Sequence, residues 1–359
     1  MDIETIAPEE LRDAAARMLG AMVDRRAPYE AGKAADRVGL FGAMVEQGWL
    51  LLTVPTDMDG LGQSFAALAP IYEELGKALA PVVLAPTLAS LELLSASPAE
   101  ALTGLAAAIA GGEASVAVAT GTDGLTIAAQ GAEASLSGTL EGILADEGAT
   151  HLLVLADEGQ AWLVDLADAG ASVSVVDSWD RSRILLDVTL DGAQAVAALA
   201  TADPAATDRV RAHLDLALAW DCVGGAAKSL DETLEYLRTR KQFDRPIGSF
   251  QALKHRAADH KVELEVARGA ATNATAAFVA GHEDAVPLTG RARLVAEQAY
   301  RSMAEDSVQL HGGIGFTWEY DCHLFLKRAI LNELLYGKAN QRRDRIAPAV
   351  IARMAQAMA

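Results

Sequence analysis

The sequence predicts a mostly helical α+β protein in which a β domain lies between two helical regions. Ala and Leu dominate a chain that is 51% hydrophobic but only 5% aromatic, which favours helices over an all-β fold. Short β-type runs gather in the middle of the chain, and long helix-periodic stretches fill its last part. We therefore predict an N-terminal helical domain over residues 1–112, a middle antiparallel β domain over 113–202, and a C-terminal four-helix bundle with a tail over 203–359.

The first region contains helix-like stretches that are rich in Ala and Leu and are separated by Pro and Gly. They cover residues 11–23, 39–49, 64–79 and 84–110. The glycine-bearing loop Pro55–Gly62 leads into the third stretch. We expect Gly76 to cap the C-terminus of that helix, because glycine adopts the left-handed conformation that often ends helices.

The middle region contains short β-type runs that are separated by turn residues such as those at 121–124. The runs cover residues 115–119, 125–129, 152–156, 161–166, 172–176 and 183–190. This spacing indicates an antiparallel sandwich or a small barrel. The region has no Gly-x-Gly-x-x-Gly motif, so a Rossmann dinucleotide site is not predicted.

Two long helical patterns flank a basic turn in the last region. Residues 209–237 form an almost unbroken apolar helix pattern, and Pro246 limits how far this helix can extend. After the turn, apolar and small residues recur at steps of three and four and predict one face of a second helix. This face contains Leu253, Ala257, His260, Leu264, Ala267, Ala271, Ala274 and Phe278.

The turn itself, Arg238–Gln251, is locally basic in a chain whose formal net charge is −19. Arg238, Arg240, Lys241 and Arg245 could hold a phosphorylated ligand, because guanidinium groups form forked, charge-assisted hydrogen bonds with phosphate. The alternative is a solvated helix end whose positive charge the helix dipole favours. The spacing alone leaves both interpretations open.

A second candidate segment, Gln309–Glu319, contains Gly312, Gly313 and Gly315. We expect these glycines to end the helix that carries Gln309 and to let the backbone approach a ligand without obstruction by a Cβ atom. An ordinary helix C-terminus is the alternative. The presence of a basic and a glycine-rich segment in one bundle weakens that alternative.

Composition and cysteine content exclude several classes of function. A pI near 4.7 argues against nucleic acid or an anionic membrane as the main partner, because both require a basic surface. Cys222 and Cys322 lie far apart without zinc-ligand spacing, so neither a disulfide framework nor a metal site is predicted. The acidic N-terminus does not resemble a signal peptide, and no apolar run is long enough to span a membrane. We therefore expect a cytoplasmic protein.

Three motifs make the chain resemble the acyl-CoA dehydrogenase family over nearly its whole length. The first region contains Asp57–Gly62 and Glu73–Gly76. The basic turn contains Arg240-Lys-Gln-Phe243 followed by Phe250-Gln251, and the glycine-rich segment begins Gln309-Leu-His-Gly-Gly. The resemblance implies an FAD-dependent enzyme that introduces an α,β double bond into an acyl-CoA and passes electrons to an electron-transfer flavoprotein.

The resemblance also implies which residues bind the cofactor. In that family the Arg-x-x-Phe turn and the Gln-x-x-Gly-Gly segment hold the adenosine and pyrophosphate end of an FAD whose flavin lies mainly in the neighbouring subunit. A permanent cation, an aromatic ring, amides and bare backbone suit this role. The residues that match these motifs are Arg240, Phe243, Gln251, Gln309, Gly312 and Gly313.

The chain departs from the family at the places that hold the flavin ring and the catalytic base. Residues 117–124 and 138–142 replace the family's flavin-holding segment and the strand over the ring. The base is a Glu in many members, and Tyr336 occupies its position; a second known position for the base falls on Leu214, beside Asp215. A phenol is a poor base at neutral pH. We therefore assign no catalytic residue and keep Asp215 as a candidate.

The tail resembles a bacterial subgroup that works as α2β2 heterotetramers on CoA thioesters of steroid side chains or rings. The similar segments are 318–329 and 337–343. In that subgroup one subunit type is degenerate, and we interpret this chain as that subunit, which completes an FAD site and an active site built largely on its partner. The alternatives are a homotetrameric enzyme that uses Asp215 as its base and a non-catalytic structural subunit.

Overall fold

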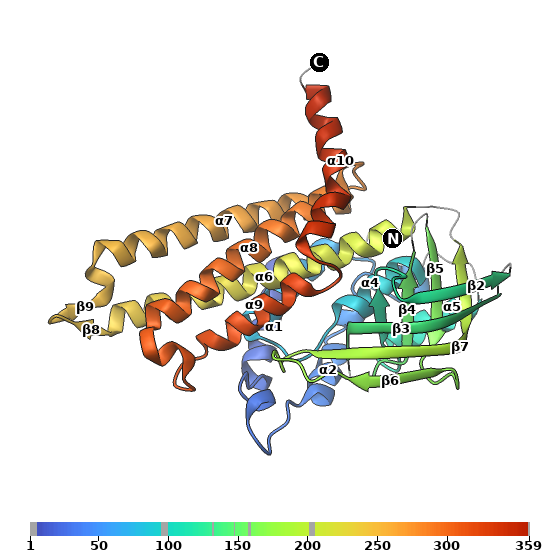
Figure 1. Ribbon diagram of the computed structural model, residues 1–359, viewed down its shortest axis with the longest axis horizontal. Helices are drawn as coiled ribbons and strands as arrows, with labels where there is room; N and C mark the ends of the chain where they lie inside the picture. Colours follow the sequence, from blue (N-terminus) through green and yellow to red (C-terminus); the bar gives the residue numbers. More distant parts are fainter. Residues whose placement is uncertain are drawn as a thin grey trace.

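A computed structural model describes residues 6–94, 100–130, 133–146, 148–156, 159–200 and 205–357. The chain folds into a helical N-terminal region, a curled β-sheet and a bundle of long helices (Figure 1). The predicted α+β, mostly helical fold with this order of domains is confirmed. Figure 1 shows the bundle extending to one side of the sheet, so that the two ends of the bundle have different surroundings.

The N-terminal region consists of helices that pack on the start of the bundle. They are α1 (Pro8–Met22), η1 (Ala27–Tyr29), α2 (Arg37–Glu46), η2 (Trp49–Leu51), η3 (Thr56–Met58), α3 (Phe65–Ala78), α4 (Ala85–Leu94) and α5 (Glu100–Ala110). The stretch predicted over residues 84–110 is thus described as two helices, and residues 95–99 lie outside the described part of the chain.

Gly76 does not cap α3, so that expectation was wrong. The helix continues to Ala78, and Leu79 takes the left-handed conformation of the cap, with φ at 51°. A Cβ atom on Gly76 would lie 2.1 Å from the carbonyl oxygen of Asp221 on α6. The glycine is therefore required for the close approach of two helices rather than for a helix end.

The middle region forms one seven-stranded sheet in the order β1-β4-β5-β7-β3-β2, with β6 also paired to β7. All described pairs are antiparallel except β1 and β4, which run parallel. The strands are β1 (Val116–Ala119), β2 (Leu125–Gln130), β3 (Glu133–Ala145), β4 (His151–Leu155), β5 (Gln160–Asp165), β6 (Ala171–Val175) and β7 (Ile184–Ala200).

Strand β3 was not among the predicted strands, although it lies between β2 and β7. Its sequence is rich in Gly and Ser, and its pairing with β7 is irregular near Gly138 and Gly142. Gly138 has φ at 132°, and a Cβ atom there would lie 2.0 Å from the carbonyl oxygen of Gly124. The strand therefore needs the glycine that obscures its β pattern in the sequence.

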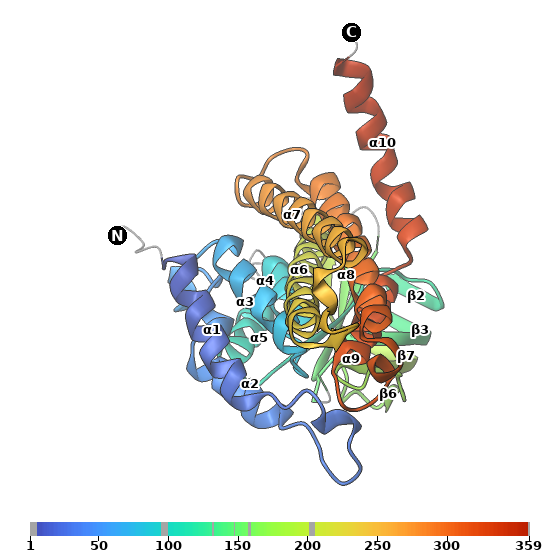
Figure 2. The ribbon, with the colours of Figure 1, turned by 90° about the vertical axis from the view of Figure 1, so that its left-hand side faces the viewer.

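The C-terminal region is a bundle around the buried helix α6. Its elements are α6 (Ala206–Thr239), β8 (Lys241–Gln242), β9 (Arg245–Pro246), η4 (Ile247–Ser249), α7 (Gln251–Val279), α8 (Ala285–His311), η5 (Gly312–Phe316), α9 (Cys322–Leu334) and α10 (Ala339–Ala357). Both views show α10 projecting away from the rest of the molecule (Figures 1 and 2). In the described part of the chain, no helix combines the length and the apolarity that crossing a membrane requires.

The predicted inner face of α7 is confirmed. Every member of the predicted set from Ala257 to Phe278 is buried, and Leu253 at the edge of the set is half-buried. The predicted helix over 209–237 is also confirmed, as α6. These helices could be predicted because their apolar positions follow the helical period without interruption.

A buried polar network joins the sheet to the bundle. Asp221 of α6 accepts hydrogen bonds from Arg183 at 2.6 Å, from Asn332 at 2.8 Å and from Arg328 at 3.3 Å. Arg328 also donates to Asp180 at 3.2 Å. Because these groups come from the β6–β7 connection, α6 and α9, the network fixes the sheet relative to the bundle and leaves Asp221 fully engaged.

Candidate functional site

The basic turn forms a hairpin at the end of the bundle that lies away from the sheet (Figure 1). Arg240 follows the last residue of α6, and β8 and β9 come directly after it. Phe243 and Asp244 at the hairpin tip both have positive φ angles, and the Phe243 side chain is 85% exposed. An exposed aromatic ring at a strained tip is available to a ligand or to another chain.

The glycine-rich segment lies beside the same end of α6. The α8 helix ends at His311, and Gly312 has φ at 66°, which confirms that glycine ends this helix. Tyr236 stacks on the His311 ring with centroids 4.2 Å apart, and its hydroxyl donates to the His311 carbonyl at 3.4 Å. Tyr236 thus places the end of α6, which Arg240 follows, beside the end of α8, which Gly312 follows.

All six residues that the resemblance assigns to the cofactor are exposed. They are Arg240, Phe243, Gln251, Gln309, Gly312 and Gly313. Contacts connect these segments in two places. Tyr236 stacks on His311 and so joins the Arg240 segment to the Gly312 segment. The ring centre of Phe250, the residue before Gln251, lies 6.1 Å from the ring centre of Phe243. No described hydrogen bond joins the side chain of Gln251 to Gln309. The cofactor role of these residues stays a prediction.

The geometry of this exposed surface fits the phosphate-bearing end of a nucleotide cofactor. An added Cβ atom at Gly312 or Gly313 would meet no other atom within 4 Å, so the backbone there is open to a ligand. Arg238, two residues before Arg240, reaches Glu235 only at 4.0 Å. Arg240 itself forms no ion pair with a described carboxylate, which leaves its guanidinium group available to an anion.

A cavity of about 550 Å³ lies between the sheet and the C-terminal helices. Its walls come from the β1–β2 connection, the middle of β3, the start of α6, the turn after α9 and the start of α10. They include Thr120, Asp123, Glu141, Gly142, Asp208, Arg211, Tyr336, Gly337, Arg342 and Arg345. Because residues 118–121, Asp123 and residues 140–144 line this cavity, both segments that we predicted to depart from the family pattern border it.

Tyr336, which the family resemblance predicts at the position of the base, lies in the turn that borders this cavity. Its φ angle is 54°, and its buried hydroxyl has no hydrogen-bond partner within the described chain. Burial raises the pKa of the phenol well above its usual value, although Arg183 and Arg293 oppose this effect. The side chain therefore stays neutral and cannot accept a substrate proton at neutral pH.

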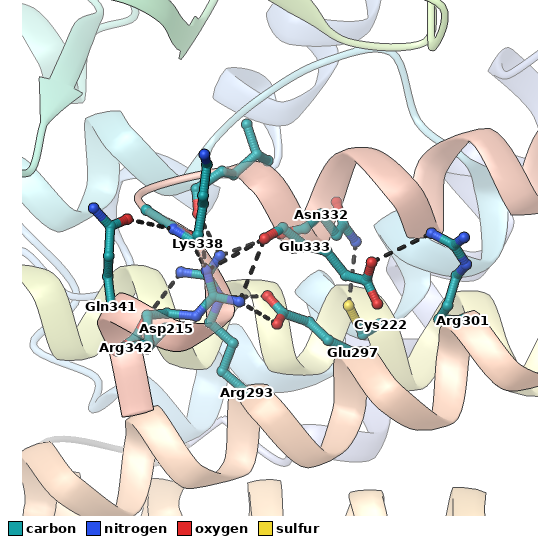
Figure 3. A network of polar contacts seen from close by, with 12 residues as sticks. Asp215, Cys222, Arg293, Glu297, Arg301, Asn332, Glu333, Lys338, Gln341 and Arg342 are labelled. Carbon is teal, nitrogen blue, oxygen red and sulfur yellow. Dashed lines mark hydrogen bonds and ion pairs between the residues drawn. The ribbon is translucent and has the colours of Figure 1, made fainter. Parts of the chain in front are cut away.

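Both carboxylate oxygens of Asp215 accept hydrogen bonds from arginines, and Figure 3 shows the residue beside Arg293 and Arg342. Arg293 donates to Oδ1 at 2.9 Å, and Arg345 donates to Oδ2 at 3.0 Å. The Asp215 side chain is only 4% exposed. A buried carboxylate that forms such ion pairs has a structural role, which is the alternative to a role as the catalytic base.

The same network fixes the turn that carries Tyr336 (Figure 3). Arg293 is fully buried and donates to Glu297 at 2.7 Å and to the carbonyl oxygens of Asn332 at 3.2 Å and Leu335 at 2.5 Å. Arg342 bonds Glu297 and the carbonyl oxygen of Gly337. The two guanidinium groups thereby satisfy the free carbonyl groups at the end of α9.

Sequence inspection missed Arg293 and Arg342 because each lies in a helix where arginine usually faces solvent. One pattern could have revealed the first of them. Arg293 and Glu297 are four residues apart, and both lie among the alanines that form the buried side of α8. An ion pair on an otherwise apolar helix face indicates a buried network rather than a solvated surface.

Among the residues described by the structure, no group of three or more His, Cys, Asp or Glu side chains is placed to bind a metal ion. Cys222 and Cys322 are both free and buried. His311, which lies in the glycine-rich motif, donates through Nδ1 to the Ser307 carbonyl oxygen at 2.7 Å and stacks against Tyr236. Its contacts are those of a packing residue.

The chain thus consists of a helical domain, a curled sheet and a helical bundle, with a cavity between the last two. Residues 7–97 match the sequence family described as acyl-CoA dehydrogenase, N-terminal domain, and residues 212–351 match acyl-CoA dehydrogenase, C-terminal domain. The chain belongs to the acyl-CoA dehydrogenase family. It is therefore an oxidoreductase of the type that acts on CH–CH bonds, with FAD as its cofactor.

One relative and two solved structures align with almost the whole chain. Acyl-CoA dehydrogenase IpdE2 of Mycobacterium tuberculosis is 32% identical over 90% of this chain and 92% of its own. The solved structure of the Tcur3481-Tcur3483 steroid ACAD G363A variant is 26% identical, with a TM-score of 0.87 over 97% of this chain and 98% of that one. The ChsE4-ChsE5 complex from Mycobacterium tuberculosis, at 23% identity and a TM-score of 0.84 over 98% and 99%, shares the fold.

Proposed function

We propose that this chain is the degenerate subunit of an α2β2 acyl-CoA dehydrogenase. It completes the FAD site of a second acyl-CoA dehydrogenase subunit, and that partner supplies the catalytic base. One observation carries the proposal: neither candidate position for the base offers a free carboxylate. Tyr336 occupies one position, and both oxygens of Asp215 beside the other are bound to arginines.

The exposure of the cofactor residues supports a site shared between chains. Arg240 and Phe243 lie in the connection after α6 that forms the β8–β9 hairpin, and Gln309 and Gly312 lie at the end of α8. The hairpin is at the end of the bundle away from the sheet (Figure 1), whereas residues of β3 line this chain's own cavity. An FAD molecule bound in this chain's own cavity would not reach the cofactor residues at that end of the bundle. An FAD held mainly by a neighbouring subunit brings its pyrophosphate to them without any change in this chain.

The outer surfaces of the bundle also support assembly. Val262 and Val266 on α7 are 62% and 57% exposed, and Ile351 and Met354 on the projecting α10 are similarly exposed. Large apolar side chains gathered on exposed helix faces are typical of surfaces that another subunit covers. We infer that the partner packs on these helices.

The substrate in this proposal is a bulky, steroid-derived acyl-CoA. Support comes from the relative of known structure that is described as a steroid ACAD. Bound FAD would accept the hydride that leaves the substrate's β-carbon. Arg240 would pair with its diphosphate, Gly312 and Gly313 would offer backbone contacts, and an electron-transfer flavoprotein would reoxidise it. The two free cysteines are consistent with a reducing cytoplasm.

The test is co-expression of this chain with an acyl-CoA dehydrogenase subunit encoded beside it, followed by measurement of subunit and flavin stoichiometry. We expect the chain alone to be colourless or poorly soluble, and the complex to bind FAD and oxidise acyl-CoA. A stable, fully flavinylated homotetramer with activity would instead support the alternative in which Asp215 is the base. A complex whose flavin content does not depend on this chain would support the structural alternative.

A further inference from the structure

A second pocket is lined by residues from all three domains. It has a volume of about 420 Å³. Tyr29 comes from η1, Trp179 from the β6–β7 connection, Trp318 from the segment before α9, and Lys327 from α9 itself. None of these residues belongs to the cofactor motifs or to the larger cavity.

Lys327 lies among three aromatic rings and lacks a carboxylate partner within the described part of the chain. Its Nζ atom is 4.4 Å from the centre of the Tyr29 ring, 5.8 Å from that of Trp318 and 5.9 Å from that of Trp179. Asp180 is the nearby carboxylate, but it accepts hydrogen bonds from Tyr29 at 2.8 Å and from Arg328 at 3.2 Å. Among the described residues, the ammonium group therefore contacts aromatic rings rather than a carboxylate.

Burial lowers the pKa of Lys327, and Arg181 adds to this effect while Asp180 opposes it. Arg181 lies on the rim of the pocket, where its only described carboxylate partner is the exposed Asp177 at 3.5 Å. An anion in the pocket would stabilise both cations. A phosphate group suits this place, because it can accept hydrogen bonds from an ammonium and a guanidinium group together.

Two tryptophan side chains beside these cations have faces that are exposed to solvent. Trp179 is 69% exposed and Trp318 is 50% exposed, which is unusual for residues of this size. Trp318 is supported from behind by Tyr29, at 5.9 Å between ring centres, and by His323, at 4.8 Å. A supported indole with an open face is a surface on which a planar base can stack.

We propose that this pocket binds a nucleoside phosphate, with the base on Trp179 or Trp318 and the phosphate on Lys327 and Arg181. The volume is within the range of small-ligand sites. A free adenine nucleotide and the nucleotide end of coenzyme A share this chemistry. The site does not depend on where FAD binds or on which subunit supplies the catalytic base, so it can be tested separately from the proposed function.

The experiment uses the full-length chain in the assembly in which it purifies, loaded with FAD so that the cofactor site is filled. ADP, adenosine 3′,5′-bisphosphate and inorganic phosphate are titrated by calorimetry, with tryptophan fluorescence as a second measurement. We expect saturable binding of both nucleotides with dissociation constants below about 1 mM, and much weaker binding of phosphate. Preference for the bisphosphate identifies the coenzyme A end, and equal binding identifies a free nucleotide.

Two variants and one control locate the site. Trp179→Ala and Lys327→Gln should each weaken nucleotide binding about tenfold, by loss of stacking and of an ionic contact respectively. Lys261→Gln, which removes an exposed lysine paired with Glu265 on α7, should leave binding unchanged. Flavin content should stay the same in all three, because Trp179 and Lys327 lie outside the cofactor motifs, and thermal stability should change little, because Trp179 is exposed and Lys327 is only half-buried.

Several results would overturn the proposal. It fails if neither nucleotide binds, if binding is equal in the two variants and the parent protein, or if phosphate binds as tightly as ADP. It also fails if acrylamide cannot quench Trp179 in the assembly but can in the isolated chain, because a partner subunit then covers the indole.

Discussion

Replacing Asp215 with Asn should destabilise the protein and leave most of the activity of the assembled enzyme. Asp215 lies 2.9 Å from Arg293 and 3.0 Å from Arg345, and Arg293 is fully buried. Removing one partner of a buried ion pair typically costs 3–5 kcal/mol, because the other charge stays buried without compensation. Asn keeps one acceptor oxygen and Glu297 still pairs with Arg293, so we expect about 3 kcal/mol.

The assay compares urea unfolding and turnover in Asp215→Asn and in a matched control. Glu265→Gln removes the negative charge of an exposed ion pair with Lys261, and such pairs contribute about 0–1 kcal/mol. The control should therefore be nearly unchanged in both measurements. A fall of several orders of magnitude in kcat for Asp215→Asn, with FAD bound and stability unaltered, would show that Asp215 is the base and would refute this argument.

Three further predictions concern single side chains. Arg240→Ala should weaken flavin binding by roughly one to two orders of magnitude, measured by flavin release on dilution. Arg238→Ala is the control and should not weaken it. If the Arg240→Ala variant retains as much flavin as the parent protein, Arg240 is only a solvated helix end. Tyr336→Phe should leave stability equal or raise it by about 1 kcal/mol in urea unfolding, because it removes a buried hydroxyl without a partner; a clear loss would reveal a missed hydrogen bond. Burial raises the pKa of Asp146 to about 6, so the folded state favours the protonated acid, and stability should fall by about 3 kcal/mol as pH rises from about 4 to 6. Asp146→Asn should abolish this dependence in unfolding measured at both pH values; an unchanged slope would contradict the assignment.

The parts of the fold that could be predicted are those whose local pattern agrees with their final surroundings. The buried face of α7 follows the helical period, and Gly312 ends α8 as expected from its sequence. The cofactor residues could be proposed only through the family resemblance. Arg240 and Arg238 are both exposed at the same end of the bundle. Neither the helical period of the sequence nor the charge of the side chain distinguishes one from the other as the ligand-binding residue.

The parts that could not be predicted depend on residues distant in the sequence. Gly76 has the local character of a helix cap, but the backbone of Asp221 on another helix requires it. The β pattern of strand β3 is interrupted by Gly138, which must be a glycine because the carbonyl oxygen of Gly124 leaves no room for a Cβ atom. Asp215 resembles a free acid beside a catalytic position until α8 and α10 place Arg293 and Arg345 against it.

In the degenerate subunit that we propose, the arginine network would also make catalysis hard to restore by one substitution. Three guanidinium groups, those of Arg293, Arg342 and Arg345, surround Asp215 and Glu297. Two of them also bind carbonyl groups at the end of α9, so the turn that carries Tyr336 depends on their positions. A new carboxylate at Leu214 would lie next to this excess of positive charge and would be held in its charged form by it. A base of that kind binds its proton too weakly to remove one from an acyl-CoA, so several residues would have to change together.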